Sequence, residues 1–410
     1  MEVMAVNDSI KKLLKIILSV LATIIALGFI TILLANVTGY DLMQDENGRY
    51  KFMKNANILS DTMDLQTGIQ ALSFELISED IKIVTTEANT FRLEYSWLEW
   101  DEKPSISVSG GKLVYKTREK LRHVVSNFFH NAAKPPITLY VPKGTSFENA
   151  NVRTASGNIE INNIESEALS AYSTSGAITA KKSPVKTVTI ETSTGGVTLN
   201  ELKGVNFTLR TSSAIVRVED VSFETYDVTS NSGECSFTNA SGGNLKVQST
   251  TGSLSINGSQ LEGFDFITSS GSANITDLVT DEILVKSDSG NITTKRLDVA
   301  KGSFTMLSGN VDLDLTGSED EYSFIINSPL NNVYLNNKNI DGSQTYSGGQ
   351  TYSPNVNVPT GNVYQHTSSP MPNPMPNVTA ILPTNVTVGS GEKTLTFDLT
   401  GGGYVKITTN

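Results

Sequence analysis

The strongest constraint on this chain is a repeat of nineteen residues that runs through nine units without an insertion. A small residue marks the same position in each unit: Gly157, Gly176, Gly195, Ala214, Gly233, Gly252, Gly271, Gly290 and Gly309. A serine or threonine stands immediately before this position every time. Self-similarity at a fixed period of about 20 residues is typical of solenoid proteins, in which each unit buries its apolar face against its neighbours.

Apolar and polar residues alternate on both sides of the marked glycine. Two and four residues after it come pairs such as Ile159 and Ile161, and before it come pairs such as Phe264 and Phe266. A period of two indicates a strand with one buried face. The sequence therefore predicts an all-β fold, a single-stranded parallel β-solenoid of about 19 residues per coil. At roughly 4.8 Å per coil the nine coils form a rod about 40 Å long, and right-handed coiling is the default for parallel crossovers.

The glycine position is expected to be a corner that needs unusual φ/ψ values, with Ala214 as the strained or differently relaxed unit. A second hydroxyl column stands three residues before the glycine, at Ser173, Thr192, Thr211, Ser230, Ser249, Thr268 and Ser287. Its parity points inward, which favours a structural role in hydrogen-bonding the turn backbone. The alternative is an outward hydroxyl array that binds ice or a crystalline polymer. Cys235 lies in an apolar column and is predicted to be a buried, inert thiol.

Residues 16–35 contain no charged side chain and are long enough to cross the hydrocarbon core as a helix. Lys11, Lys12 and Lys15 precede this run, so the positive-inside rule places residues 1–15 in the cytoplasm and the rest outside the cell membrane. A cleaved signal peptide is the alternative. Its apolar region is usually about 7–15 residues long with small residues at the cleavage site, which favours an uncleaved single-pass anchor here.

Composition excludes some classes of function. Cys235 is the one cysteine, so no intramolecular disulfide can form, which suits a bacterial envelope protein better than a disulfide-rich extracellular module. The net charge of -11, without a basic stripe, argues against binding of nucleic acid.

The chain divides into further segments around the repeat. We expect a linker at 36–55, irregular first coils and a cap at 56–150, the regular solenoid at 151–342, a Pro/Ser/Asn-rich loop at 343–392 and a final coil at 393–410. Within the cap, residues 121–129 have apolar side chains at helical spacing. They predict a short capping helix or a packed loop, with a basic, aromatic helix on the membrane surface as the alternative. Trp97 and Trp100 are expected to cover the same end of the rod.

Some parallel β-helices are polysaccharide lyases or hydrolases, whose chemistry requires converging carboxylates or a basic residue with a metal. No such cluster builds up in the outward column three residues after the glycine, which runs from Glu160 to Asp312. His123, His130 and His366 fall outside the regular repeat, and without cysteine or carboxylate partners they are a poor metal signal. We therefore predict no enzyme, with no catalytic, metal or cofactor-binding residue and no cofactor.

Three features of the sequence are shared with a known family: the N-terminal apolar segment, the repeated Ser-Gly coils and the stretch LYVPKGTSFENANVRTASGNIEI. Together they resemble the bacterial putative-adhesin β-strand-repeat family, a domain of unknown function on Gram-positive cell surfaces. The resemblance covers about residues 56–342 and the last coil, and the Pro-rich segment departs from the family's compact C-terminus. It implies a non-catalytic surface solenoid, with some members tied to envelope stress responses.

Two functions remain open from the sequence. The first is an adhesin-like surface or envelope interaction protein, with the membrane as anchor and a cell-wall glycan or a surface protein as ligand. The alternative is a membrane-tethered envelope-stress sensor or regulator whose partner lies in the bilayer. A carbohydrate-active β-helix enzyme ranks below both.

Overall fold

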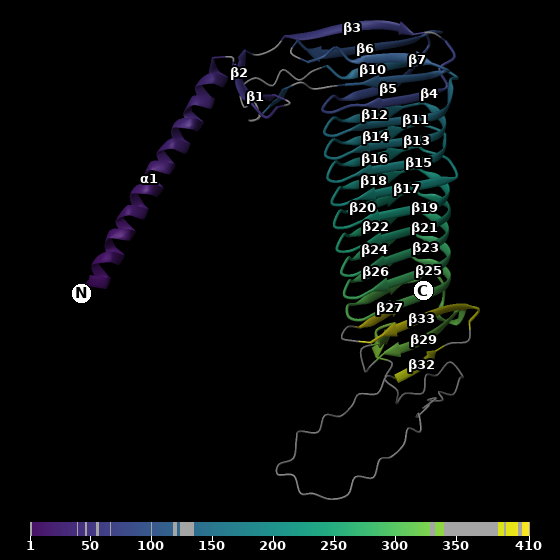
Figure 1. Cartoon of the computed structure of the whole chain (residues 1–410). Helices are drawn as coiled ribbons and strands as arrows, with labels where there is room; N and C mark the ends of the chain where they lie inside the picture. Colours follow the sequence, from purple (N-terminus) through teal and green to yellow (C-terminus); the bar gives the residue numbers. More distant parts are fainter. Residues whose placement is uncertain are drawn as a thin grey trace, which may run out of the picture.

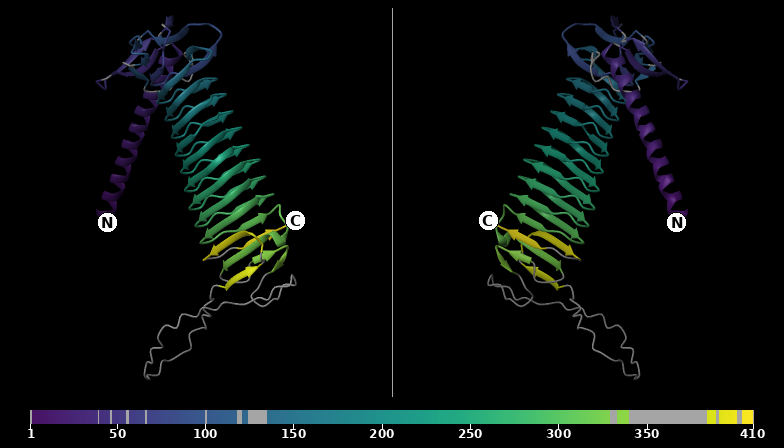
Figure 2. Two further views of the ribbon diagram at one scale, coloured as in Figure 1. Left: turned by 90° about the vertical axis from the view of Figure 1, so that its right-hand side faces the viewer. Right: turned by 90° about the vertical axis from the view of Figure 1, so that its left-hand side faces the viewer.

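The fold is a long, two-sided stack of β-strands preceded by one helix, seen here in a computed structural model (Figure 1). The structure describes residues 2–38, 40–45, 47–54, 57–65, 67–99, 101–117, 121–123, 135–328, 333–339, 384–388, 391–400 and 404–409. The helix α1 spans Glu2–Val37. Figure 2 shows the stack from two further sides, with its rungs nearly parallel along the length of the rod.

Two large sheets form the walls of the rod. The first has 16 strands, in the spatial order β3 (Ile58–Leu65), β6 (Phe91–Leu98), β10 (Ile137–Pro142), β5 (Ile81–Thr86), β12 (Ile159–Asn162), β14 (Ile178–Lys181), β16 (Val197–Asn200), β18 (Val216–Glu219), β20 (Cys235–Thr238), β22 (Leu254–Asn257), β24 (Ala273–Thr276), β26 (Ile292–Lys295), β28 (Val311–Asp314), β34 (Val405–Thr408), β30 (Val333–Leu335) and β31 (Lys338–Asn339).

The second sheet has 15 strands, in the order β32 (Thr384–Val388), β29 (Tyr322–Ser328), β33 (Lys393–Leu399), β27 (Asp298–Met306), β25 (Val279–Ser287), β23 (Gln260–Thr268), β21 (Ser241–Ser249), β19 (Ser222–Ser230), β17 (Asn206–Thr211), β15 (Val185–Thr192), β13 (Glu165–Ser173), β11 (Ser146–Thr154), β4 (Ala71–Glu75), β8 (Lys112–Lys116) and β7 (Ser105–Ser109). A third, three-stranded sheet consists of β2 (Tyr50–Lys54), β1 (Tyr40–Asp45) and β9 (Leu121–His123). One short 3-10 helix, η1 (Glu319–Glu321), lies before β29.

Each unit contributes one strand to each large sheet, and successive units pair in parallel at equivalent positions. Ile159 pairs with Ile178, and Val188 pairs with Phe207, nineteen residues apart in both cases. The alternating apolar residues of both sheets point inward and are buried, for example Ile161, Phe207 and Phe264. The predicted parallel β-solenoid is confirmed: stacking supplies the core that no single unit could form.

The glycine corner has a different cause from the one expected. Of the nine residues in this column, only Gly309 has a positive φ. At the other seven glycines the backbone of the preceding rung leaves no room for a side chain: a Cβ on Gly176 would be 1.9 Å from the carbonyl oxygen of Gly157. Ala214 is buried, has no positive φ and keeps the same hydrogen bond to Thr211 as its counterparts, so the expectation of a special conformation there was wrong.

A left-handed corner lies instead six residues after the marked position in the first eight units. Its φ values run from 51° to 63° at Asn163, Lys182, Glu201, Asp220, Asn239, Gly258, Asp277 and Arg296. Asn, Asp and Gly adopt this conformation readily, whereas other L-residues have a higher energy there by about 1–2 kcal/mol. Three of the eight residues in this column therefore bear a conformational cost.

The ends of the rod also depart from the expected segments. The region expected as a linker contains β1 and β2, and residues 121–123 of the expected helix form β9 instead; residues 124–134, with His130, lie outside the described part of the chain. At this end β3 and β7 pair antiparallel with their neighbours. Trp97 packs against the core, and Trp100 is not among the described residues.

The C-terminal segment is not the last coil in space. β33 pairs with β27 on one side and β29 on the other, and β34 likewise lies between β28 and β30. The chain thus completes a rung at β29 and β30, passes through the Pro-rich segment, and returns to fill the rung before it. Of residues 340–392, the structure describes 384–388, as β32, and 391–392.

Candidate binding groove

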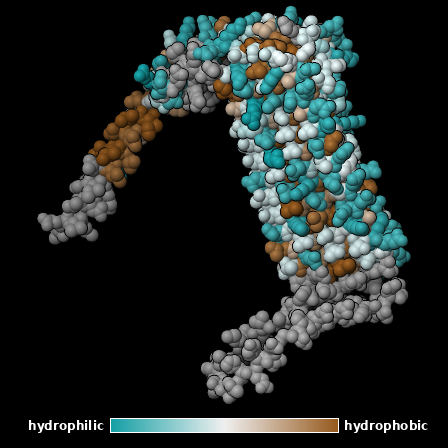
Figure 3. All heavy atoms as spheres, turned by 45° about the vertical axis from the view of Figure 1, so that its right-hand side comes forward, coloured by the Kyte–Doolittle hydropathy of each residue, from teal (hydrophilic) through white to brown (hydrophobic). Residues whose placement is uncertain are grey.

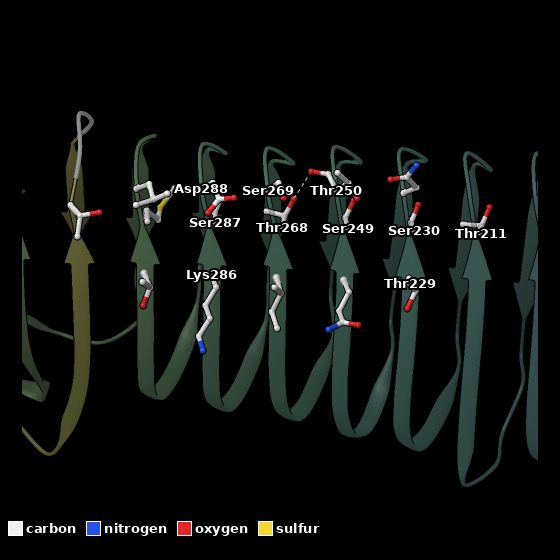
Figure 4. Close-up of a pocket in the computed structure, with 17 residues that line it drawn as sticks. Thr211, Thr229, Ser230, Ser249, Thr250, Thr268, Ser269, Lys286, Ser287 and Asp288 are labelled. Carbon is white, nitrogen blue, oxygen red and sulfur yellow. Dashed lines mark hydrogen bonds between the residues drawn. The ribbon is translucent and has the colours of Figure 1, made fainter.

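An open groove of about 670 Å³ runs along the rod where the strands of the 15-stranded sheet end. Its lining extends over consecutive rungs from β17 to β27, with Thr400 at the far end. In Figure 4 these rungs stand side by side and their side chains form rows across them. A volume of this size lies within the range of small-ligand sites, but the elongated shape follows the axis of the solenoid.

Two outward rows flank the groove. The strand row consists of Thr229, Gln248, Ile267, Lys286 and Thr305, each directly paired with the next across the sheet. The turn row lies two residues further along each rung and consists of Asn231, Thr250, Ser269, Asp288 and Leu307. Since paired strands are about 4.8 Å apart, each row offers one side chain per 4.8 Å along the rod.

Between the two rows lie the inward hydroxyls of the column three residues before the glycine. Ser287 accepts a hydrogen bond from the N–H of Gly290 (2.8 Å), and Thr268 accepts one from Gly271 (2.8 Å). Thr268 also donates to the carbonyl of Thr250, the dashed contact in Figure 4. These hydroxyls satisfy the turn backbone, as the structural interpretation of this column predicts, so a ligand would meet the two outward rows.

The groove is nearly neutral. The charged residues among those that line it are Lys286, in the strand row, and Asp288, in the turn row of the same rung. The remaining lining offers hydroxyls and amides, with Ile267 and the 56% exposed Leu307 as apolar contacts. Such a surface can bind a neutral polymer through many weak hydrogen bonds and a few apolar contacts.

The other residues singled out from the sequence do not gather at this groove. Glu160, in the outward column of the 16-stranded sheet, forms an ion pair with Lys82 (3.1 Å). His123 lies in β9, and His366 lies outside the described residues. Within the described parts of the chain, no three His, Cys, Asp or Glu side chains are close enough to hold a metal ion.

Cys235 is 2% exposed and lies on the inner face of β20. Burial raises the pKa of its thiol to about 11, against a smaller lowering by a hydrogen bond with Ser230. Because the thiolate is the reactive form, this cysteine has the character of a core residue.

The groove itself was missed from the sequence. The period shows which residues share a column, and the outward column after the glycine is the one in which any catalytic cluster would be expected. The two rows before the glycine carry no catalytic residue type, so nothing in their composition marked them. The position of these rows on the two sides of the groove depends on how the backbone turns at the end of each strand, which the period does not specify.

Comparison with individual proteins gives only weak likenesses. No curated protein matches the chain. Two crystal structures show a likeness: one of a putative adhesin from Parabacteroides merdae, at 14% identity and a TM-score of 0.30 over 62% of this chain and 95% of that one, and one of a putative cell adhesion protein from Clostridium sporogenes, at 8% identity and a TM-score of 0.17 over 86% and 100%. At TM-scores this low neither likeness bears on fold or function.

The sequence itself matches a family over most of the solenoid. The match to Toastrack DUF4097 covers residues 69–240 and again 229–352, which together extend from just before the cap strand β4 past the ninth repeat unit. This agrees with the resemblance drawn from the Ser-Gly repeat and its Pro-Lys-Gly lead-in. The chain belongs to the Toastrack DUF4097 family of β-solenoid domains.

Proposed function

We propose that this protein is a membrane-anchored, extracytoplasmic rod that binds an extended, neutral polymer along its groove, in the manner of an adhesin. The observation that carries the proposal is the pair of outward rows, which place one side chain on every rung at equal spacing, all of them polar except Ile267 and Leu307. A surface with side chains at a fixed spacing is suited to a periodic ligand, because each added unit of the polymer can contact another rung at the same spacing. A cell-wall glycan and an extended peptide both have this form.

A binding role without catalysis is supported by the lining of the groove. Asp288 is the one carboxylate among the lining residues. Glycoside hydrolysis generally requires two carboxyl groups about 5–10 Å apart across the scissile bond. The lining residues therefore lack the pair that a typical glycosidase needs.

Anchoring is supported by α1. Its segment Leu14–Ala35 has 22 residues, a mean hydropathy of 2.8 and no buried residue. At about 1.5 Å per residue it matches the thickness of a bilayer's hydrocarbon core. Figure 3 shows this part of the helix as a continuous hydrophobic surface, in contrast to the mixed surface of the rod. Thr23 and Thr31 donate their hydroxyls to carbonyls one turn earlier, which satisfies these groups inside the helix.

Anchoring also has a consequence for orientation. In Figures 1 and 2, α1 and the rod extend from the same end of the molecule toward the same side. With α1 across a bilayer, the rod has to turn away from the helix to remain outside the membrane.

Retention of the full-length protein on purified cell wall, on membrane vesicles and on matrix proteins tests the proposal. The groove variant carries Thr229→Arg and Gln248→Arg, which fill the hollow with charged side chains on exposed or half-buried positions. The control carries Thr198→Arg and Ser236→Arg at half-buried positions of the 16-stranded sheet, a column that already contains Arg217. We expect the groove variant to bind about tenfold more weakly or worse, equivalent to about 1.4 kcal/mol, with the control unchanged. Equal retention of both variants would remove the groove as the binding site.

A further inference from the structure

The three-stranded sheet β2-β1-β9 follows α1 almost without a connection. The helix ends at Val37 and β1 begins at Tyr40. Thr38 closes the helix, because its hydroxyl donates to the carbonyls of Leu34 and Ala35, both at 2.9 Å. Tyr40 follows Ala35, the end of the apolar segment, after five Cα-to-Cα steps, so a fully extended chain would place them at most about 17 Å apart.

One face of this small sheet is aromatic. In the antiparallel register of β1 and β2, Tyr40 is opposite Lys54, Leu42 is opposite Phe52, and Gln44 is opposite Tyr50. Opposite residues and alternate residues along a strand share a face, so all six lie on the same side of the ribbon.

The three aromatic side chains of this face are open to solvent. Tyr40 is 43% exposed, Tyr50 63% and Phe52 46%. Exposed aromatic residues gathered on one small face mark an interaction surface.

We propose that this aromatic face lies in the interfacial layer of the bilayer that α1 crosses, with lipid headgroups as its partner. The inference rests on the proposed anchoring of α1. Tyrosine is enriched at the membrane interface, because its ring enters the apolar region while its hydroxyl remains hydrated. Lys54 on the same face has an apolar stem and a charged end that can reach anionic headgroups.

Proximity favours lipid over a second copy of the chain as the partner. The short connection from Ala35 holds the face near the end of the hydrocarbon core wherever the rod points. Arg49 and Lys51 are exposed on this hairpin beside Lys54, so that cationic side chains are available to headgroups, although Asp41, Asp45 and Glu46 leave residues 40–54 without net charge. The sheet would then act as a collar that fixes the capped end of the rod at the membrane and directs the groove outward.

Spin labels on the full-length protein in vesicles of phosphatidylcholine and phosphatidylglycerol test the inference. Cys235→Ala provides a background without cysteine, and the labels are placed on single cysteines introduced by Tyr50→Cys and Phe52→Cys in the collar. Leu27→Cys in α1 reports on anchoring, and Thr198→Cys on the rod is the aqueous reference. Collision rates with oxygen, which concentrates in lipid, and with a water-soluble nickel chelate are measured at each site.

We expect collisions with nickel at positions 50 and 52 to be several-fold lower than at 198, with oxygen collisions between those at 198 and at 27. If position 27 is in lipid but positions 50 and 52 match 198, the collar is in water and the inference is overturned while anchoring stands. Low collision rates with both reagents at 50 and 52 would show burial against another protein copy, which also overturns it. An aqueous signal at position 27 would overturn anchoring, and the inference with it.

Discussion

Gly309 has a φ of +116°, and Met306, three residues before it, replaces the hydroxyl residue found at that position in the eight preceding units. In those eight units the side-chain oxygen accepts the N–H of the residue at the glycine position, at 2.8–3.2 Å. Methionine has no such acceptor. The conformation of the corner therefore changes at the one unit where the buried hydroxyl is missing.

This relationship predicts a coupling between the two positions. Gly309→Ala should destabilise the protein, in part because an L-residue is disfavoured at a positive φ. In a Met306→Ser background the corner can adopt the conformation of the other units, so the same substitution should cost about 1 kcal/mol less. Chemical unfolding of the four proteins of this double-mutant cycle measures the difference. If the effects of the two substitutions were additive, a hydroxyl at position 306 would not determine the conformation of residue 309.

Adjacent glycines in one turn provide a matched test of rung packing. A Cβ on Gly195 would lie 2.0 Å from the carbonyl oxygen of Gly176, whereas the nearest atom to a Cβ on Gly196 is 3.8 Å away. We expect Gly195→Ala to lower the free energy of unfolding by about 1–3 kcal/mol, as overpacking does, and Gly196→Ala to have little effect. Thermal and denaturant unfolding of the two variants decide between close packing and a conformational reason. Similar losses in both would argue against close packing.

The left-handed column predicts a stabilising substitution. Glu201 has a φ of 54° and is exposed, with an ion pair to Lys182 at 3.8 Å that solvent screens. Glu201→Gly should raise the free energy of unfolding by up to about 1 kcal/mol, because glycine is not penalised at this φ. Glu219→Gly, at the end of β18 and without a positive φ, is the control and should lower stability. A loss of stability in both variants would contradict the conformational argument.

Cys235 predicts a pH dependence in the alkaline range. Its pKa is raised from the usual 9.0 to about 11 in the folded protein. The unfolded chain therefore loses this proton first, so the contribution to stability is complete below pH 9 and is lost as the pH rises to about 11. Unfolding free energies of the native protein should fall more steeply across this window than those of Cys235→Ala. Parallel curves would show that the thiol has the same pKa in both states.

The sequence predicted the solenoid because its repeat has no insertions and its alternation leaves one buried face per strand. The inward parity of residues such as Thr268 and Cys235 followed from the same period. The left-handed residues at Lys182, Glu201 and Arg296 gave no signal, since their type is unusual for that conformation. The groove rows were hidden for a related reason: serine, threonine and asparagine are common throughout the chain.

The order of the last rungs depends on tertiary contacts. The alternating pattern of residues 393–408 is that of a coil, but the same pattern fits any position along the rod. Leu395 reaches into the space left by the missing side chain of Gly302, Phe397 stacks on Phe304 at 5.0 Å, and Lys393 pairs with Asp298 at 2.9 Å.

The sequence by itself thus determined the architecture, the face of each strand and the length of the rung, because these depend on periodicity alone. Tertiary structure decided which strands are neighbours at the C-terminal end. The pairing of β27 with β33, about ninety residues apart, depends on the fit of particular side chains such as Leu395. A repeat pattern does not specify that fit.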